Sequence, residues 1–305
     1  RINTDSESEA LLNLVAAELQ RAIQDTSAGK SPLDEESVFT AVERLHRRAT
    51  GSFSVVAMIT GWGVIAIRDR HGIRPLCMGS RTEDGMVERI FASESVALDV
   101  LDFKLDRDVK PGETVIVRSN GAITSRICAP VSEPRPCIFE HVYFSRPDST
   151  IDGVSVHAAR LEMGRIMGER ILKENPDHGI DVVVPVPDSG RIAALELART
   201  LGVQSREGFG KNRYIGRTFI MPGQNVRKKS VRKKLNTILG EFQNKNVLIV
   251  DDSIVRGNTS KRIVEMARSA GAEQVFFASC APPVIHPNVY GCLLYTSPSP
   301  RDGLL

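Results

Sequence analysis

Two adjacent carboxylates, Asp251 and Asp252, directly follow the apolar run 246–250 and precede a polar turn that opens a helix. Paired carboxylates at a strand end can hold sugar hydroxyls, or they can grip a hydrated divalent cation such as Mg²⁺. The turn adds backbone N–H groups and hydroxyls at a helix N-terminus, which together form a cradle for a phosphate group. The residues expected to bind such a ligand are Asp251, Asp252, Ser253, Arg256, Gly257, Asn258, Thr259 and Ser260.

A second polar turn, residues 187–191, follows the apolar run 181–186. Its glycine can bring backbone N–H groups close to a pyrophosphate group. The same residues also fit a plain strand–turn–helix connection in which Asp188 or Ser189 caps the helix. Ligands of doubly wound sheets bind at the carboxyl ends of the strands, so both turns are expected at one edge. Asp188, Ser189 and Gly190 form this second candidate set.

The elements that must position these turns alternate along the C-terminal half of the chain. Short, continuously apolar runs predict buried strands, and they are separated by segments with helical periodicity. This alternation is typical of a parallel sheet with crossover helices, that is, an α/β domain. The predicted strands are 181–186, 246–250 and 274–279, and the predicted helices are 154–172, 191–201 and 259–270.

The N-terminal part has a different, α+β texture. Helical spacing predicts helices at 6–25 and 35–48, the second with an acidic start and a basic end that suit the helix dipole. Short apolar runs bounded by glycines then predict strands of an antiparallel or mixed sheet. These runs are 53–59, 63–69, 91–94 and 114–117. The predicted organisation is a domain at 1–118, a linker at 119–136, a domain at 137–291 and a non-native tail at 292–305.

Composition excludes several classes of protein. The 305 residues are 41% hydrophobic and 25% charged, as expected for a globular chain rather than a disordered one. A net charge of +3 does not suggest a nucleic-acid partner. No apolar run reaches the roughly 18 residues of a membrane span, and no signal peptide is recognised. Five scattered cysteines without a CxxC pair indicate a reducing compartment, so we expect a cytoplasmic protein.

The acid pair and its turn are similar to the signature of type I phosphoribosyltransferases. Within that class, the chain resembles the glutamine phosphoribosylpyrophosphate amidotransferase family from its first residue to Gly291. Other blocks carry the resemblance beyond the acid loop. They are Gly72–Leu76, Ala92–Ala97, Tyr143–Ser149, Lys211–Ile220 and His286–Gly291.

The resemblance implies a partial N-terminal-nucleophile glutaminase domain followed by a type I phosphoribosyltransferase domain. It implies amidophosphoribosyltransferase activity, which converts glutamine, 5-phosphoribosyl-1-pyrophosphate (PRPP) and water to 5-phosphoribosylamine, glutamate and pyrophosphate in purine biosynthesis. It also implies Mg²⁺, feedback by purine nucleotides and a homo-oligomer. The family's N-terminal cysteine nucleophile is absent from these 305 residues, so no catalytic residue of the glutaminase reaction is expected here.

Individual positions also take roles from the resemblance. Ser189 is expected to join Asp251 and Asp252 as a metal ligand, and Glu7 falls where the family binds the glutamine amino group. The basic, Gly- and Pro-interrupted segment 211–235 is expected to close over the substrate. The residues expected to wall a passage for ammonia are Tyr143, Tyr214, Arg217, Phe219 and Ile220.

Two alternatives are a regulatory protein with a phosphoribosyltransferase fold and a salvage enzyme that acts on a free base. The first would need a DNA-binding module, which we do not find, and the second would leave 1–118 unexplained. Some family members hold an iron–sulfur cluster, and Cys137 falls at its first ligand position. The second position is occupied by Asn288, a poor ligand for iron, so we expect no cluster. All five cysteines are expected to be buried small residues.

Overall fold

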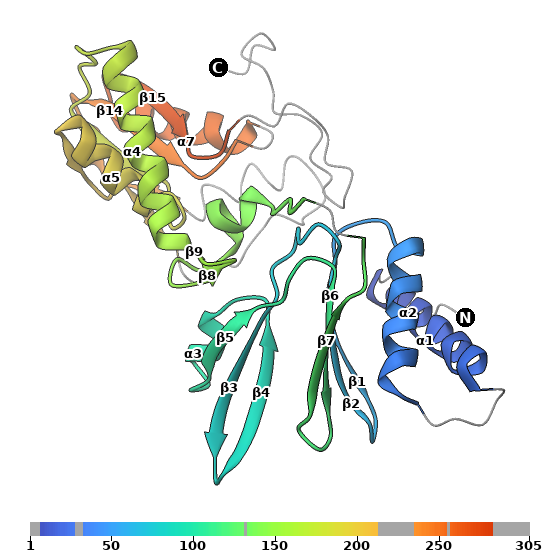
Figure 1. Ribbon diagram of the computed structural model, residues 1–305. Coiled ribbons are helices and arrows are strands. Elements are labelled where there is room, and N and C mark those ends of the chain that lie inside the picture. Colours follow the sequence, from blue (N-terminus) through green and yellow to red (C-terminus); the bar gives the residue numbers. More distant parts are fainter. Residues whose placement is uncertain (1–6, 28–32, 131–132, 213–234, 255–256, 283–305) are drawn as a thin grey trace. The chain divides into compact units, whose positions relative to one another are not determined.

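The computed structural model describes residues 7–27, 33–130, 133–212, 235–254 and 257–282. The chain divides into two compact units (Figure 1). Of the described residues, unit 1 comprises those up to Cys137 and 148–154, and unit 2 comprises 138–147 and those from Ser155 onward. The chain therefore leaves unit 1 after Cys137, returns to it for seven residues, and leaves it again.

Unit 1 is α+β, as the sequence predicts. Helices α1 (Glu7–Ser27) and α2 (Glu35–Arg48) lie on one side of an antiparallel sheet with the strand order β1-β2-β6-β7 (Figure 1). Asp34 caps α2, because its carboxylate accepts a hydrogen bond from the backbone N–H of Ser37 at 2.8 Å. The apolar side of α2, with Val38, Val42 and Leu45, packs on Ile65, Ile67 and Ile116 of the sheet.

The strands of that sheet are β1 (Ser54–Ile59), β2 (Gly63–Arg68), β6 (Glu113–Arg118) and β7 (Ile123–Ile127). A second sheet has the order β4-β3-β5, from β3 (Cys77–Glu83), β4 (Met86–Ala92) and β5 (Lys104–Asp108), with the short helix α3 (Val96–Asp99) between β4 and β5. A small core that includes Ala66, Leu76 and Met78 packs between strands of the two sheets. The expected antiparallel character of this half is confirmed.

Unit 2 contains the predicted parallel sheet, with the order β11-β10-β14-β15. All three pairings are parallel. The long strands are β10 (Val182–Pro185), β14 (Asn246–Asp251) and β15 (Gln274–Ser279), and β11 (Gln204–Ser205) adds a short edge. Helices α4 (Val156–Glu174), α5 (Arg191–Leu201) and α7 (Asn258–Ser269) complete the unit, at the positions that the helical periodicity predicts.

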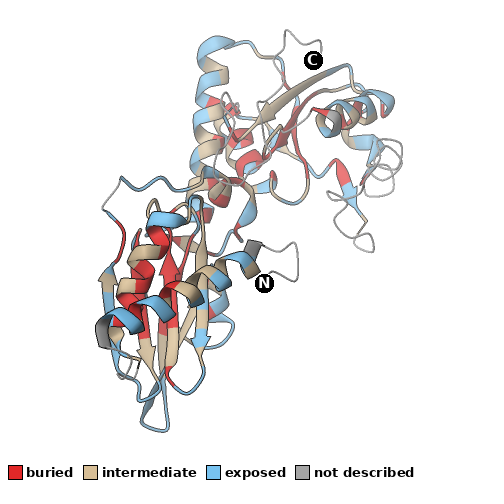
Figure 2. Cartoon of the chain, turned by 90° about the vertical axis from the view of Figure 1, so that its right-hand side faces the viewer, coloured by how far each residue is buried: buried red, intermediate tan, exposed pale blue. Residues whose placement is uncertain are grey.

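Helices cover both faces of this sheet. Successive residues of a strand point to opposite faces, so their contacts show which helix covers each face. Val183, Leu248 and Val250 face a core built with α5 and flanked by α4. Val184, Val247 and Ile249 face the other way, into a core with Ile263 and Ala267 of α7. Figure 2 shows buried residues concentrated on strands and on helix sides in each unit. The doubly wound arrangement explains why these strands are apolar on both faces.

Two expectations need correction. The stretch 119–136 was predicted to be a linker, but it contains β7, which pairs with β6 along its whole length. Strands β3 and β5 were also missed, because β3 ends in exposed polar residues and β5 alternates charges rather than apolar side chains. The predicted boundary at 118 falls between the paired strands β6 and β7, whereas the boundaries at 136 and 291 stay predictions. The tail 292–305 lies outside the described residues.

Candidate functional site

The acid pair lies where the sequence predicts, at the carboxyl end of the central strand β14. Asp251 is the last residue of β14 and pairs with Ser279 of β15. Asp251 and Asp252 are each buried, at 8% exposure of the residue. The backbone around them is fixed, because the N–H groups of Cys280 and Ala281 donate to the carbonyls of Asp251 and Asp252 at 3.0 and 2.8 Å. Two acids are therefore held rigidly at one sheet edge.

Hydroxyl groups from two segments converge on Asp252. Ser189, which follows the neighbouring strand β10, donates its Oγ–H to Oδ2 of Asp252. Ser253 donates to Oδ1 of the same carboxylate at 2.6 Å. Ser189 and Asp252 are 63 residues apart in sequence, and the parallel pairing of β10 with β14 brings them together. The structure thus joins the two turns that the sequence marked separately.

Burial, and then the negative charge of Asp252, raise the pKa of Asp251 to about 7. The backbone N–H of Asp252, which donates to Asp251 Oδ1 at 2.9 Å, opposes this rise without cancelling it. Two carboxylates this close in a shielded position repel each other when both are charged. Such a pair favours a cation or hydrogen-bond donors as its ligand.

Backbone geometry favours a glycine at each of the two turns. Gly190 opens α5, and a Cβ added there would lie 2.5 Å from the carbonyl oxygen of Val250. Gly257 precedes α7 with a φ of +70°, a conformation that favours glycine. The helices α5 and α7 therefore begin at the same sheet edge as the acids, and their N–H groups suit a phosphate group. The peptide bond between Pro187 and Asp188 is cis.

The donor set fits a divalent cation bound partly by its substrate. Among the described residues, no group of three or more His, Cys, Asp or Glu side chains surrounds a single point. Mg²⁺ commonly takes only one or two carboxylates from a protein and completes its shell with water and phosphate oxygens. Asp251, Asp252 and the Ser189 hydroxyl supply hard oxygen ligands of this kind.

Charged side chains form a network of ion pairs around the second turn. Asp188 forms ion pairs with Lys211 and with Arg191, and Arg191 also contacts Glu207 at 2.9 Å. Lys211 ends strand β12 (Phe209–Lys211), which pairs with β13 (Leu235–Thr237) so that Lys211 lies opposite Leu235. The two ends of the predicted covering segment 211–235 therefore meet. In the sequence, Lys211 is marked as the first residue of the resemblance block Lys211–Ile220.

Several predicted site residues lie outside the described residues. They are Arg256 of the acid loop and Tyr214, Arg217, Phe219 and Ile220 of the covering segment. Glu7 is the first residue of α1. Tyr143 lies in a π-helix, η1 (Glu140–Phe144), where its ring is 5.6 Å from that of Phe144. The roles of these residues in binding stay predictions.

The cysteines only partly match the expectation of burial. Cys77 and Cys128 are buried, and burial raises the pKa of each thiol to about 11. Cys137 and Cys280 are half-buried, so the expectation is wrong for them, while Cys292 lies outside the described residues. Burial, with the charges of the acid pair, raises the pKa of Cys280 to about 12. The thiol beside the acids is therefore a poor nucleophile.

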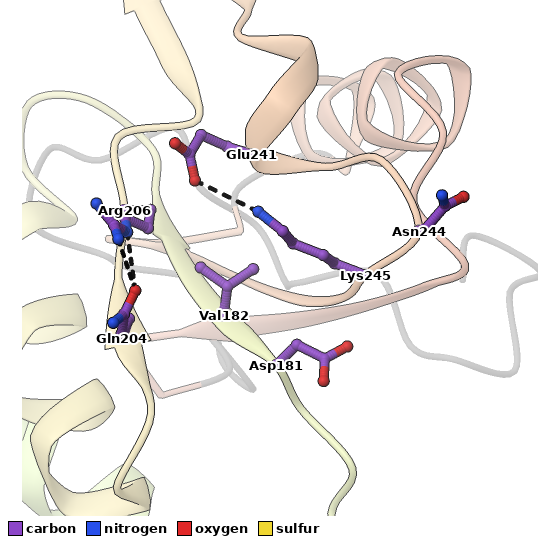
Figure 3. Close-up of a pocket in the computed structure, with 7 residues that line it drawn as sticks. All are labelled: Asp181, Val182, Gln204, Arg206, Glu241, Asn244 and Lys245. Carbon is purple, nitrogen blue, oxygen red and sulfur yellow. Dashed lines mark hydrogen bonds and ion pairs between the residues drawn. The ribbon is translucent and has the colours of Figure 1, made fainter.

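A separate hollow of about 470 Å³ lies at the opposite edge of the parallel sheet (Figure 3). It is lined by Asp181, Val182, Gln204, Arg206, Glu241, Asn244 and Lys245. Its two cations already have partners, because Arg206 donates to Gln204 and Lys245 pairs with Glu241. The amino ends of β10 and β14 border this hollow, so it is distinct from the acid site.

The fold and the acid loop of unit 2 agree with a known domain family. Residues 156–282 match the family model described as the phosphoribosyl transferase domain. The chain thus contains such a domain, with the type I arrangement of a parallel sheet and a strand–acid–acid–turn–helix unit.

More specific matches extend through both units. The chain is 56% identical over 292 residues to the amidophosphoribosyltransferase of Pseudomonas aeruginosa, 52% identical over 291 residues to that of Escherichia coli, and 49% identical over 294 residues to that of Saccharomyces cerevisiae. Each match covers 95% of this chain. The similarity to these amidophosphoribosyltransferases therefore extends over nearly the whole length of this chain.

A solved structure agrees with this relationship. Glutamine PRPP amidotransferase from B. subtilis, complexed with ADP and GMP, superimposes with a TM-score of 0.78 at 35% identity, covering 97% of this chain and 59% of that chain. The chain spans 57% of the Pseudomonas protein and 56% of the Escherichia and Saccharomyces proteins. Among the described residues, no helix is long and apolar enough to cross a membrane.

Proposed function

We propose that unit 2 binds PRPP with Mg²⁺ at the acid pair, and that the complete protein is an amidophosphoribosyltransferase of purine biosynthesis. The observation that carries the proposal is the convergence of Asp251, Asp252 and the Ser189 hydroxyl at one edge of a parallel sheet. The turn 253–260 would receive the 5-phosphate, and the turn 188–190 the pyrophosphate. Similarity to amidophosphoribosyltransferases along both units supports this assignment over a salvage or regulatory protein.

The chain's own residues would act by binding and orienting the substrate. The acid pair would hold the ribose hydroxyls or the cation, so that C1 of the ribose faces the incoming nucleophile. Mg²⁺, when bound, would neutralise charge on the departing pyrophosphate. Ammonia attacks as a neutral molecule, so positioning and charge stabilisation would matter more than a strong general base. Backbone N–H groups at the start of α5 would stabilise the leaving group.

Unit 1 is proposed to be part of a glutaminase domain that supplies the ammonia. The support is that the relatives and the B. subtilis structure align with both units, not with unit 2 alone. Under this proposal Glu7 would bind the glutamine amino group, and Tyr143, Tyr214, Arg217, Phe219 and Ile220 would wall the passage for ammonia. Feedback by purine nucleotides, a homo-oligomeric state and a cytoplasmic location belong to the same proposal. The ADP and GMP bound to the B. subtilis enzyme support the first of these.

The test is calorimetric titration of PRPP in the presence and absence of Mg²⁺. The double variant Asp251→Asn with Asp252→Asn should weaken Mg²⁺-dependent binding by at least roughly 100-fold, because losing even an outer partner of a metal ligand costs roughly 10- to 100-fold. Asp181→Asn is the matched control, since it changes an aspartate at the opposite edge of the same sheet. Unchanged binding by the double variant would refute the assignment of the acid pair.

A further inference from the structure

Arg68, at the end of β2, is a fully buried guanidinium whose five N–H groups all have acceptors. Nε donates to the carbonyl of Arg74 at 2.9 Å, and the remaining backbone acceptors are the carbonyls of Val109 and Gly72 at 2.7 and 2.9 Å. The last two N–H groups bind Oδ1 and Oδ2 of Asp152 at 2.7 and 2.8 Å. A guanidinium has five N–H donors, so Arg68 is saturated. Its side chain is 1% exposed.

The loop that Arg68 holds, residues 69–75, is built to receive it. Gly72 has a φ of +61°, and a Cβ there would lie 3.3 Å from the Cζ of Arg68 and 2.7 Å from Pro111. Asp69, also fully buried, accepts backbone hydrogen bonds from His71 and Ile73 at 2.9 and 3.3 Å. Hydrogen bonds from Arg68 and to Asp69 therefore hold the loop from both sides.

Both ends of segment 138–147, the first excursion out of unit 1, are anchored by Arg68 and this loop. Before the segment, the backbone N–H of Arg135 donates to the carbonyl of His71 at 2.8 Å, and that of Cys137 to the carbonyl of Ile73 at 3.3 Å. After it, Asp152 is gripped by Arg68 in a bidentate ion pair. The residues just before and just after segment 138–147 are therefore both held by Arg68 and the loop 69–75.

Further bonds fasten the returning residues 148–154 to unit 1. The hydroxyl of Ser149 donates to Glu94 at 2.8 Å, and the N–H of Thr150 donates to the Ser95 hydroxyl at 2.8 Å. Within unit 2, Arg160 of α4 donates to the carbonyls of His141 and Ser145, which lie in and just after the π-helix, at 2.8 and 2.7 Å. The segment that carries Tyr143 is thus clamped at its ends and at its middle.

From these contacts we infer that Arg68 and Asp152 are positioning residues, which hold segment 138–147 and thereby Tyr143 in place for ammonia transfer. This inference rests on the proposed function. Neither side chain is assigned to substrate; each acts through the backbone that it holds. Loosening the clamp should leave the phosphoribosyl site intact but let ammonia escape before it reacts.

The first test is amide hydrogen exchange on the chain itself. Asp152 has a φ of +48°, which asparagine tolerates well, so Asp152→Asn removes the charge without straining the turn. One Arg68 N–H then faces an amide NH₂ group, and exchange in peptides covering 138–147 should accelerate by roughly tenfold. Glu36→Gln is the matched control, because Glu36 forms a bidentate pair with Arg126 elsewhere in unit 1. Unchanged exchange in Asp152→Asn would overturn the inference.

The second test uses the protein from the complete open reading frame and compares two rates. With glutamine, Asp152→Asn should release several-fold more glutamate per phosphoribosylamine formed than the parent or Glu36→Gln. With free ammonia the parent and the variant should form phosphoribosylamine equally fast. Faster amide exchange in 138–147 with an unchanged ratio of glutamate to phosphoribosylamine would overturn the positioning role. An equal loss of the glutamine-dependent and the ammonia-dependent activity would overturn it as well. If the parent forms no product from ammonia, the proposed function fails, and the exchange result still decides the anchoring.

A second variant keeps the inference testable if Asp152→Asn does not fold. Ser149→Ala removes the hydrogen bond to Glu94 and leaves the Arg68–Asp152 pair in place. It should change the exchange and the product ratio in the same direction as Asp152→Asn, by a smaller factor. If Asp152→Asn does not fold, an unaltered ratio in Ser149→Ala would count against the inference.

Discussion

Side chains at the acid site act as a cluster whose members come from separate parts of the chain. Asp251 and Asp252 follow one strand, whereas Ser189 follows its neighbour and donates to Asp252. Ser253 occupies the other oxygen of that carboxylate. The hydroxyl of Ser189 therefore orients an acid that the proposed function assigns to the substrate or its cation.

Ser189→Ala should weaken Mg²⁺-dependent PRPP binding by roughly tenfold, since a hydrogen bond to a charged group is worth about 1.5–3 kcal/mol. Titration calorimetry measures the change. Ser189→Thr serves as the control, because it keeps a hydroxyl on the same carbon. The prediction fails if the alanine and threonine variants bind equally well.

His46 links protonation to the stability of unit 1. The residue is 1% exposed, its Nε2 has no hydrogen-bond partner in the part of the chain that the structure describes, and its ring stacks on Phe53 with the ring centroids 5.5 Å apart. Burial, and then the charge of Arg70, lower the pKa of His46 from 6.5 to about 4. Between these two pH values the unfolded chain binds a proton at His46 and the folded chain does not. The free energy of unfolding therefore falls as the pH drops through that window.

When the pH is lowered from about 7.5 to about 5, protonation of His46 in the unfolded chain should reduce the free energy of unfolding by about 2 kcal/mol. Urea unfolding of the parent at both pH values measures this loss. His46→Phe should show a smaller loss over the same range, whereas His157→Gln, at an exposed position, should behave like the parent. Equal pH dependence in His46→Phe and the parent would contradict the prediction.

Among the elements, α4 and α5 pack so closely that a glycine is required between them. A Cβ on Gly164 of α4 would lie 2.2 Å from the carbonyl oxygen of Ala193 in α5. Both helices cover the face of the sheet formed by Val183, Leu248 and Val250. Their spacing sets where α5 begins, and α5 begins at the acid site.

Gly164→Ala should therefore lower the free energy of unfolding by about 1–3 kcal/mol, as overpacking of a well-packed contact does. Gly240→Ala is the control, because a Cβ there meets nothing within 4 Å. Chemical denaturation of the two variants gives the comparison. Equal stability of the two variants would mean that the helices can separate without cost.

At the scale of the whole molecule, two compact units with separate cores make up the chain. Units with their own cores can unfold in separate transitions. If PRPP and Mg²⁺ bind only unit 2, they should stabilise one transition and leave the other unchanged.

Scanning calorimetry tests this expectation directly. At a ligand concentration of about 100 times Kd, the stabilised unit should gain about 2.7 kcal/mol. The double variant Asp251→Asn with Asp252→Asn should show no shift, which separates specific binding from a general salt effect. A shift of both transitions by equal amounts would argue against independent units.

The amino-acid sequence is sufficient to predict the parallel sheet and the place of the acid site on it. The strands 182–185, 246–251 and 274–279 are apolar on both faces because helices cover both, and such runs are visible without any structure. Acids that directly follow such a strand must lie at its carboxyl edge, so the acid pair was predictable too. Strands β3, β5 and β7 were not, because their exposed sides carry polar residues that resemble loops.

Contacts between side chains that are far apart in the sequence become visible only in the folded chain. Ser189 reaches Asp252 across 63 positions, and Arg68 reaches Asp152 across 84. No periodicity records such pairs, because each partner satisfies only its own local pattern: Arg68 ends a strand, and Asp152 occupies a turn. Their pairing follows from the cost of burying a guanidinium, which is met only when the folded chain brings five acceptors to one place.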